Sequence, residues 1–373
     1  MSNPRLRSLL VAGVSASLTM ALGVSASAAP TPSPVASPVP SPTASIAVGE
    51  PNPSTPTATP SPTATPTPKP YPTPAAPCSA SIATKSKDLG KFYAYVIDVP
   101  TGRVLLDIRG GEQTPSASVL KVVTAATAME YLPADYTAKT SVYSVPSEPG
   151  TLVLVGGGDH TLSAMTGTSF TTYPKPARLD ALAARVLQTW TGAEEVKKIV
   201  LVDNFFAGPN YNPAWKASDR TNGYISLITG LQVDSDRANP DLTDVKYSGS
   251  RSTNPVLSAG KYFKAAIGEI AKSATLVEAK TPVTAIEIKA IKSQPISVWL
   301  DHALKYSDNT ETEFIAKHAL KYSGKSTSFK NIQAMAVATL KKLKIDGKKL
   351  VMVDGSGLAQ ANRVTAQLIT QIM

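Results

Sequence analysis

Proline is distributed very unevenly along this chain of 373 residues, and the distribution limits what the chain can fold into. Seventeen of the 31 prolines lie between Pro30 and Pro77, where they alternate with serine, threonine and alanine. Such a segment has little apolar surface to bury and favours the extended polyproline II conformation. We therefore predict a Pro/Ser/Thr-rich linker over residues 29–77, with the folded part after it. It is either a semi-rigid spacer or a tail without a geometric role.

The first 28 residues have the pattern of a secretory signal peptide. Arg5 and Arg7 form a positively charged start, residues 9–24 are mostly apolar and small, and residues 26–28 (Ala-Ser-Ala) match a small-x-small cleavage site. An uncleaved membrane anchor is the alternative, but the apolar run is short for a bilayer span. We expect residues 1–28 to be a signal peptide and the protein to be exported, either cell-wall associated or secreted.

Cysteine and histidine are scarce in this sequence. The chain has one cysteine and three scattered histidines, which argues against a disulfide framework, a zinc module and a histidine-based triad. We therefore expect no metal and no cofactor. The net charge of +10 suits either an exported protein near anionic wall polymers or a protein that the charge only keeps soluble. No basic stretch is interleaved with aromatic residues, so nucleic acid is not expected as a partner. Nothing implies a stable protein partner.

The residues after the linker alternate between strand and helix patterns, which is typical of a mixed α/β fold. Strands are predicted at residues 92–99, 103–108, 151–155, 198–203, 284–291 and 351–353. Helices are predicted at residues 117–132, 178–191, 261–270, 297–305, 310–320 and 331–343.

A serine and a lysine three residues apart open the first predicted helix. Ser118 and Lys121 would lie on one helix face, with Cβ atoms about 5–6 Å apart. A lysine can take the proton of a serine only when its pKa is lowered, and burial near the positive end of a helix dipole lowers it. The spacing alone is weak evidence, because Ser258 and Lys261 share it. The alternative is that Ser118 caps the helix while Lys121 extends towards solvent.

A second polar motif, Ser307-Asp308-Asn309, lies between two predicted helices. Residues two apart point the same way in an extended backbone, so the Ser307 hydroxyl and the Asn309 amide would face one cleft. The hydroxyl can relay a proton to a leaving group, and the amide can hold a substrate carbonyl or support a lysine. Helix capping by Ser307 or Asn309 is the alternative, and Ser252 and Asn254 have the same spacing.

The order of these motifs along the chain resembles that of penicillin-binding proteins and β-lactamases, in which Ser-x-x-Lys precedes Ser-Asp-Asn. Further landmarks follow in order: Gly156-Gly157-Gly158-Asp159, Asp203-Asn204-Phe205, Tyr306, Glu313, Asp354-Gly355-Ser356-Gly357 and Asn362-Arg363. From about residue 85 onward, the chain is similar to the class C low-molecular-mass penicillin-binding proteins, the D-alanyl-D-alanine carboxypeptidase/endopeptidase family.

The resemblance implies a fold and a reaction. The fold is a transpeptidase/β-lactamase-like α/β domain, a sheet with flanking helices. It would comprise residues 78–140 and 292–373, split by one or two accessory domains inserted at 141–291. The reaction is that of a serine-type D-Ala-D-Ala carboxypeptidase acting on peptidoglycan stem peptides, with Ser118 forming the acyl-enzyme. β-Lactams would acylate the same residue.

The resemblance also assigns roles to other residues. Lys121 would take the serine proton, Ser307 would pass a proton to the leaving amine, and Asn309 would orient the substrate amide and the lysine. Ser356, Gly357 and Leu358 would form part of the wall of the pocket that binds the substrate side chain.

The third motif of the family, Lys-Thr-Gly, does not occur in this sequence, which ends at Met373 in an apolar pattern of helical type. We therefore expect the sequence to be incomplete at its C-terminus. The missing strand would supply the second N–H of an oxyanion hole, so we expect the 373 residues alone to be inactive or nearly so. A non-catalytic cell-wall peptide-binding protein on the same scaffold is the alternative. The long insertion argues against a β-lactamase.

Overall fold

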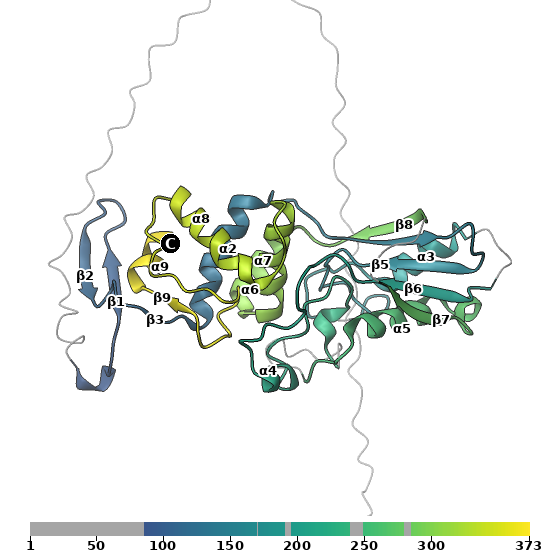
Figure 1. Ribbon diagram of the computed structural model, residues 1–373, viewed down its shortest axis with the longest axis horizontal. Helices are drawn as coiled ribbons and strands as arrows, with labels where there is room; N and C mark the ends of the chain where they lie inside the picture. Colours follow the sequence, from purple (N-terminus) through teal and green to yellow (C-terminus); the bar gives the residue numbers. More distant parts are fainter. Residues whose placement is uncertain (1–85, 170, 191–194, 239–248, 280–284) are drawn as a thin grey trace, which may run out of the picture. The chain divides into compact units, whose positions relative to one another are not determined.

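The structure is a computed structural model, which describes residues 86–169, 171–190, 195–238, 249–279 and 285–373 (Figure 1). The predicted signal peptide and linker lie outside the described residues. The described residues belong to one compact unit that runs from Cys78 to Met373. Among them, none of the helices combines the length and the apolar character needed to cross a membrane.

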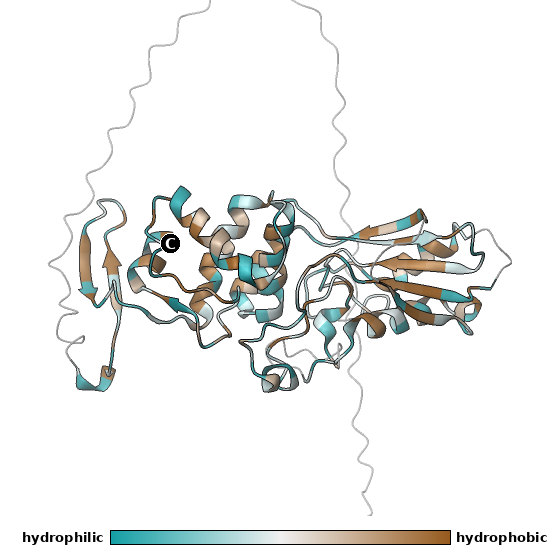
Figure 2. Ribbon diagram, viewed as in Figure 1, coloured by the Kyte–Doolittle hydropathy of each residue, from teal (hydrophilic) through white to brown (hydrophobic). Residues whose placement is uncertain are grey.

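A five-stranded mixed sheet lies in the part of the chain predicted to be an insertion, with the strand order β7-β6-β5-β4-β8. The strands are β4 (Lys139–Ser144), β5 (Thr151–Val155), β6 (Lys198–Val202), β7 (Thr275–Ala279) and β8 (Ile286–Lys292). β5, β6 and β7 are parallel, whereas β4 pairs antiparallel with β5 and β8. β5 and β6 are almost continuously apolar and appear mostly brown in Figure 2, as expected for parallel strands buried on both faces.

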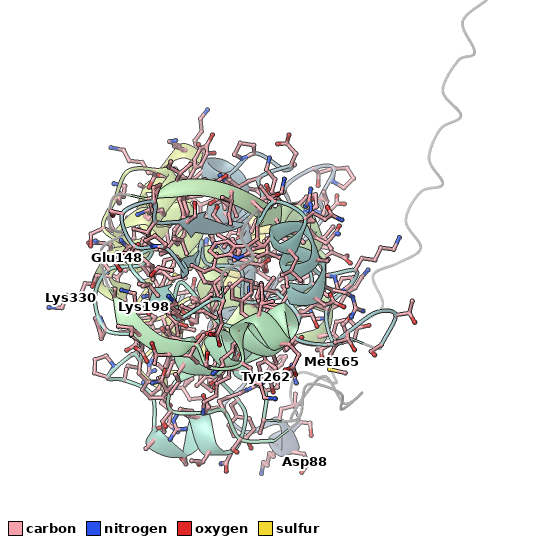
Figure 3. The ribbon with its side chains drawn as sticks, turned by 90° about the vertical axis from the view of Figure 1, so that its right-hand side faces the viewer. Asp88, Glu148, Met165, Lys198, Tyr262 and Lys330 are labelled. Carbon is pink, nitrogen blue, oxygen red and sulfur yellow. The ribbon has the colours of Figure 1, made fainter. Side chains whose placement is uncertain are left out.

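Two helices, α3 (Leu179–Leu187) and α5 (Pro255–Ile267), pack on this sheet and share one hydrophobic cluster with it. The close approach of α5 depends on a glycine. A Cβ at Gly260 would lie 2.5 Å from a methyl carbon of Leu201 on β6. At the surface, Glu148 in the β4–β5 connection forms an ion pair with Lys198 at the start of β6 (Figure 3).

The rest of the described chain is mainly helical. It contains α2 (Leu120–Tyr131), α6 (Ile296–Tyr306), α7 (Asn309–Tyr322), α8 (Ile332–Lys342) and α9 (Ala366–Ile372). α2 contacts α7, α8 and α9, and their apolar faces form a second cluster that includes Leu120, Phe314, Met335 and Leu368. This cluster positions the N-terminal ends of α2 and α7 close together.

Smaller elements complete the described part. An antiparallel hairpin pairs β1 (Ala94–Ile97) with β2 (Val104–Ile108), and a short pair joins β3 (Thr114–Pro115) to β9 (Arg363–Val364). A short helix, α4, spans Ala217–Thr221. Five 3₁₀ helices span Lys87–Leu89, Ala117–Val119, Asp234–Asp236, Glu269–Ala271 and Phe329–Asn331.

The predicted α/β class, with a sheet and flanking helices, is confirmed, but some predicted elements are wrong. The strand predicted at residues 351–353 is only a single bridge between Val351 and Arg363. α5 begins six residues earlier than predicted, because the Asn254 side chain accepts a hydrogen bond from the Leu257 N–H and Pro255 fits the first helical turn. β4 and β7 were not predicted.

The predicted domain boundaries stay a prediction. Trp215, Ile225 and Ile228 lie within the predicted insertion, yet their side chains belong to the helical cluster that contains Leu120. Packing therefore crosses the proposed boundary.

Candidate active site

Ser118 lies in the 3₁₀ turn that leads into α2, and Lys121 lies in the first turn of that helix. The Ser118 side chain is exposed, whereas that of Lys121 is only 3% exposed. The Lys121 Nζ lies 3.1 Å from the Ser118 Oγ. Ser118 makes no capping hydrogen bond through its side chain. The alternative in which the serine caps the helix and the lysine extends to solvent is therefore wrong.

The Lys121 amine has two further hydrogen-bond acceptors. Its Nζ lies 2.7 Å from the Asn309 Oδ1 and 2.8 Å from the backbone carbonyl oxygen of Ser356. Burial lowers the pKa of Lys121 to about 8, although the charges of Asp308, Glu313 and Asp354 act in the opposite direction. A substantial fraction of this lysine is therefore neutral at mildly alkaline pH.

Ser307 ends α6 in the left-handed conformation, with φ of 56°, which turns the chain towards the start of α7. Its Oγ donates a hydrogen bond of 2.9 Å to the Ser118 Oγ. The N-cap of α7 is Asp308, whose carboxylate accepts from the Glu311 N–H, so neither Ser307 nor Asn309 caps this helix. The structure thus brings all four predicted catalytic residues together around one exposed hydroxyl.

The Asn309 amide is held at both ends. Its Oδ1 accepts from Lys121, and its Nδ2 donates to the carbonyl oxygen of Tyr224 at 3.0 Å. The amide orientation is therefore fixed by one acceptor and one donor from distant parts of the chain.

The segment with the predicted pocket wall forms a tight turn beside Lys121. Ser356 is fully buried, its carbonyl faces the lysine, and its Oγ accepts from the Leu358 N–H at 3.3 Å. Gly357 has φ of 84°, and a Cβ there would lie 1.8 Å from the carbonyl oxygen of Ala117. Leu358 is half-buried and packs against the helical cluster. Substrate binding by these three residues stays a prediction.

Two buried acidic groups support this site, and sequence reasoning gave neither of them a role. The Glu313 carboxylate accepts hydrogen bonds from the N–H groups of Gly355 and Ser356. The Asp308 carboxylate accepts a hydrogen bond of 3.1 Å from the Tyr173 hydroxyl and lies 3.7 Å from the Arg237 guanidinium. Burial alone would raise the pKa of Asp308, but Arg237 and a backbone N–H hold it below its usual value.

A histidine cluster lies next to Asp308. The Glu311 carboxylate contacts the Nδ1 of His302 at 2.6 Å and lies 3.5 Å from the Nε2 of His160. Burial raises the pKa of Glu311 to about 8. Despite this cluster, no group of side chains in the described part of the chain has the make-up of a metal site.

An exposed serine hydroxyl flanked by a buried lysine, a second serine and an asparagine is the arrangement found in penicillin-binding proteins. The comparisons agree with this class. The model of the D-Ala-D-Ala carboxypeptidase 3 (S13) family matches residues 79–274 and 248–373, and the chain belongs to that family.

Curated relatives include Carboxypeptidase DacB of Mycolicibacterium smegmatis, 30% identical over 291 residues that cover 78% of this chain and 62% of the relative. D-alanyl-D-alanine carboxypeptidase of Actinomadura sp. (strain R39) is 27% identical, covering 74% of this chain and 63% of the relative. The chain thus spans less than two thirds of the length of these relatives.

Solved structures show the same fold. Penicillin binding protein 4 (dacB) from Haemophilus influenzae has a TM-score of 0.61 at 15% identity, covering 74% of this chain and 73% of that protein. The same protein complexed with a β-lactam has a TM-score of 0.51 at 17% identity, covering 74% of this chain and 72% of that protein.

Proposed function

We propose that this protein is a serine-type D-Ala-D-Ala carboxypeptidase that acts on peptidoglycan stem peptides through an acyl-enzyme on Ser118. The proposal rests mainly on the position of the Ser118 Oγ, which is 3.1 Å from the Lys121 Nζ and 2.9 Å from the Ser307 Oγ. A serine becomes a nucleophile when a base lies within hydrogen-bond reach and that base is neutral near the working pH. Membership of the family supports the choice of substrate.

In the proposed acylation step, neutral Lys121 takes the proton of the Ser118 hydroxyl as the Oγ attacks the carbonyl carbon of the terminal D-Ala-D-Ala bond. A bond forms between Oγ and that carbon, and the carbon–nitrogen bond then breaks. Ser307 passes a proton to the departing amine of the terminal D-alanine and recovers one from the lysine ammonium. Its Oγ lies 2.9 Å from the Ser118 Oγ, which places the Ser307 hydroxyl next to the carbonyl carbon that Ser118 attacks.

Water completes the proposed cycle by attacking the ester carbonyl, which releases the shortened peptide and restores the Ser118 hydroxyl. Asn309 would orient the substrate amide during both steps while its Oδ1 holds Lys121. A β-lactam would acylate Ser118 in the same way, because its strained amide offers the same carbonyl to the same nucleophile. These steps need no metal and no cofactor.

We further propose that the 373 residues alone react slowly and that the protein is exported to the cell wall. The Ser118 N–H can supply one oxyanion donor, while the sequence contains no Lys-Thr-Gly motif to supply a second. Loss of one such donor costs about 10²–10³-fold in rate. The signal-peptide pattern of residues 1–28 supports export.

Labelling by a fluorescent penicillin tests the proposal, using the protein that its gene encodes. We expect one label per chain, lost in Ser118→Ala and kept in Ser258→Ala. Ser258 has the same spacing to a lysine, but its Oγ donates a hydrogen bond to the carbonyl oxygen of Asn254, the N-cap of α5. A folded protein that takes no label would refute the proposal. Stem-peptide binding without any acyl-enzyme, unchanged in Ser118→Ala, would identify a non-catalytic wall-peptide binder instead.

A further inference from the structure

Glu313 lies one helical turn after Asn309 on α7. Asn309 contacts Lys121 in the first turn of α2, whereas Glu313 contacts the Gly355–Ser356 turn. Its side chain is fully buried. The Oε1 atom accepts from the Gly355 N–H at 2.9 Å and from the Ser356 N–H at 2.7 Å, and the Oε2 atom lies 3.0 Å from the same Gly355 nitrogen. One carboxylate therefore fixes two successive peptide units of the turn.

The turn that Glu313 fixes carries an acceptor for the proposed base. The Ser356 carbonyl oxygen lies 2.8 Å from the Lys121 Nζ. On the other side of the turn, the Thr124 Oγ1 donates to the Gly355 carbonyl oxygen at 2.6 Å. The position of the Ser356 carbonyl is thus determined by contacts to α7 and α2 together.

This acceptor decides where the lone pair of Lys121 points. A protonated lysine has three N–H donors, whereas the neutral amine has two and one lone pair. The Asn309 Oδ1 and the Ser356 carbonyl oxygen can only accept, and they lie 2.7 and 2.8 Å from Nζ. If they take both N–H groups of the neutral amine, the lone pair faces the remaining neighbour, the Ser118 hydroxyl at 3.1 Å.

We propose that Glu313 is a positioning residue for the general base: it holds the Gly355–Ser356 turn so that the Ser356 carbonyl directs the lone pair of Lys121 at Ser118. The inference rests on the proposed function, because it assumes that Lys121 is the base. It assigns Glu313 no contact with substrate.

Glu313 also has an electrostatic effect that can be measured separately. The charged groups that favour the ammonium form of Lys121 are Asp308, Glu313 and Asp354, and burial opposes them. Burial raises the pKa of Glu313 itself to about 8, so its charge is fully present only at alkaline pH. Removal of that charge should lower the pKa of Lys121. Movement of the turn should instead change the reactivity of the lysine once it is neutral.

Two variants separate these effects. Glu313→Gln keeps an oxygen at the Oε1 position, which makes the contacts of 2.9 and 2.7 Å, but it loses the charge and the second contact, of 3.0 Å, to the Gly355 N–H. Glu313→Asp keeps the charge but is one methylene shorter, so it cannot reach both N–H groups without moving the turn. A displacement of about 1 Å costs up to about a hundredfold in rate.

The experiment measures the rate of acylation by a fluorescent penicillin against pH, in the full-length protein and both variants. We expect Glu313→Asp to lower the high-pH plateau by about ten- to a hundredfold, with its midpoint unchanged. We expect Glu313→Gln to keep the plateau within about threefold of the parent, with its midpoint at lower pH. Glu311→Gln is the matched control, because Glu311 is equally buried on α7 but contacts His302 instead of the turn.

Urea unfolding of each variant shows whether it is folded at the assay temperature. An unchanged plateau in folded Glu313→Asp, or equal losses in the Asp and Gln variants, would overturn the inference. So would an equal loss in Glu311→Gln, because that would reflect a general effect of buried carboxylates on α7. A parent protein that takes no label would instead refute the proposed function.

Discussion

Replacement of Gly357 by alanine should destabilise the protein far more than the same change at another glycine with nearly the same φ. Gly357 has φ of 84° and would place a Cβ 1.8 Å from the carbonyl oxygen of Ala117 and 2.7 Å from its carbonyl carbon. Gly268 has φ of 82°, and a Cβ there meets no atom within 4 Å. The two positions therefore share a positive φ and differ in the steric clash.

The magnitude follows from these two terms. An alanine at a positive φ costs roughly 1–3 kcal/mol relative to glycine, and both positions have a positive φ. The contact of 1.8 Å at Gly357 lies far below the 3.0 Å that real Cβ atoms respect, so the backbone on one side must move. Overpacking of this kind costs typically about 1–3 kcal/mol more. We expect losses of about 1–3 kcal/mol for Gly268→Ala and about 2–6 kcal/mol for Gly357→Ala.

Urea unfolding followed by circular dichroism gives the free energy of unfolding of each variant. The comparison requires that the free energies fall with urea concentration at the same slope, because equal slopes indicate that unfolding exposes the same surface. The rate of penicillin labelling adds a second measurement. Because Ala117 precedes the nucleophile, a shift of its carbonyl should also slow labelling in Gly357→Ala, while Gly268→Ala should label at the parental rate. Equal losses of stability in the two variants would show that the backbone at Gly357 or Ala117 can move without loss of free energy. That result would refute the steric argument.

Three further predictions concern the proposed catalytic groups. Labelling should speed up about tenfold per pH unit until it levels off near pH 8, because only neutral Lys121 accepts a proton and burial lowers its pKa to about 8; a flat profile between pH 6 and 9 would contradict this. Ser307→Ala should slow hydrolysis of a D-Ala-D-Ala peptide by about 10²-fold or more, measured as released D-alanine, because the proton relay is lost. Tyr173→Phe should lower the free energy of unfolding by about 1–3 kcal/mol, because the buried Asp308 loses a donor; a change below about 0.5 kcal/mol would count against it.

Much of the candidate site could be predicted from sequence, because part of its geometry is local. Ser118 and Lys121 lie three residues apart at the start of a helix, so the helical repeat alone brings their side chains near each other. The Ser307-Asp308-Asn309 motif is a compact turn between two predicted helices. Neither motif alone specifies that Ser307 and Asn309 contact Ser118 and Lys121. That prediction depended on the order of the motifs along the chain, which resembles that of a known family.

Other features could have been read from the sequence but were not. The pair Asn254-Pro255 is a helix-start signal, yet α5 was predicted to begin at residue 261. Asp308 is the N-cap of α7, and an aspartate directly before a helix is a common N-cap signal in a sequence.

The amino-acid sequence by itself determined the segregation of proline, the α/β class and the residues that can supply a nucleophile and a base. Only the tertiary structure decided what holds that base. The Ser356 carbonyl is 235 residues from Lys121, and the Tyr173 hydroxyl is 135 residues from Asp308. Such contacts depend on how α2, α7 and the 354–358 turn pack around Phe314 and its neighbours, whereas helix periodicity and turn chemistry act only over a few residues.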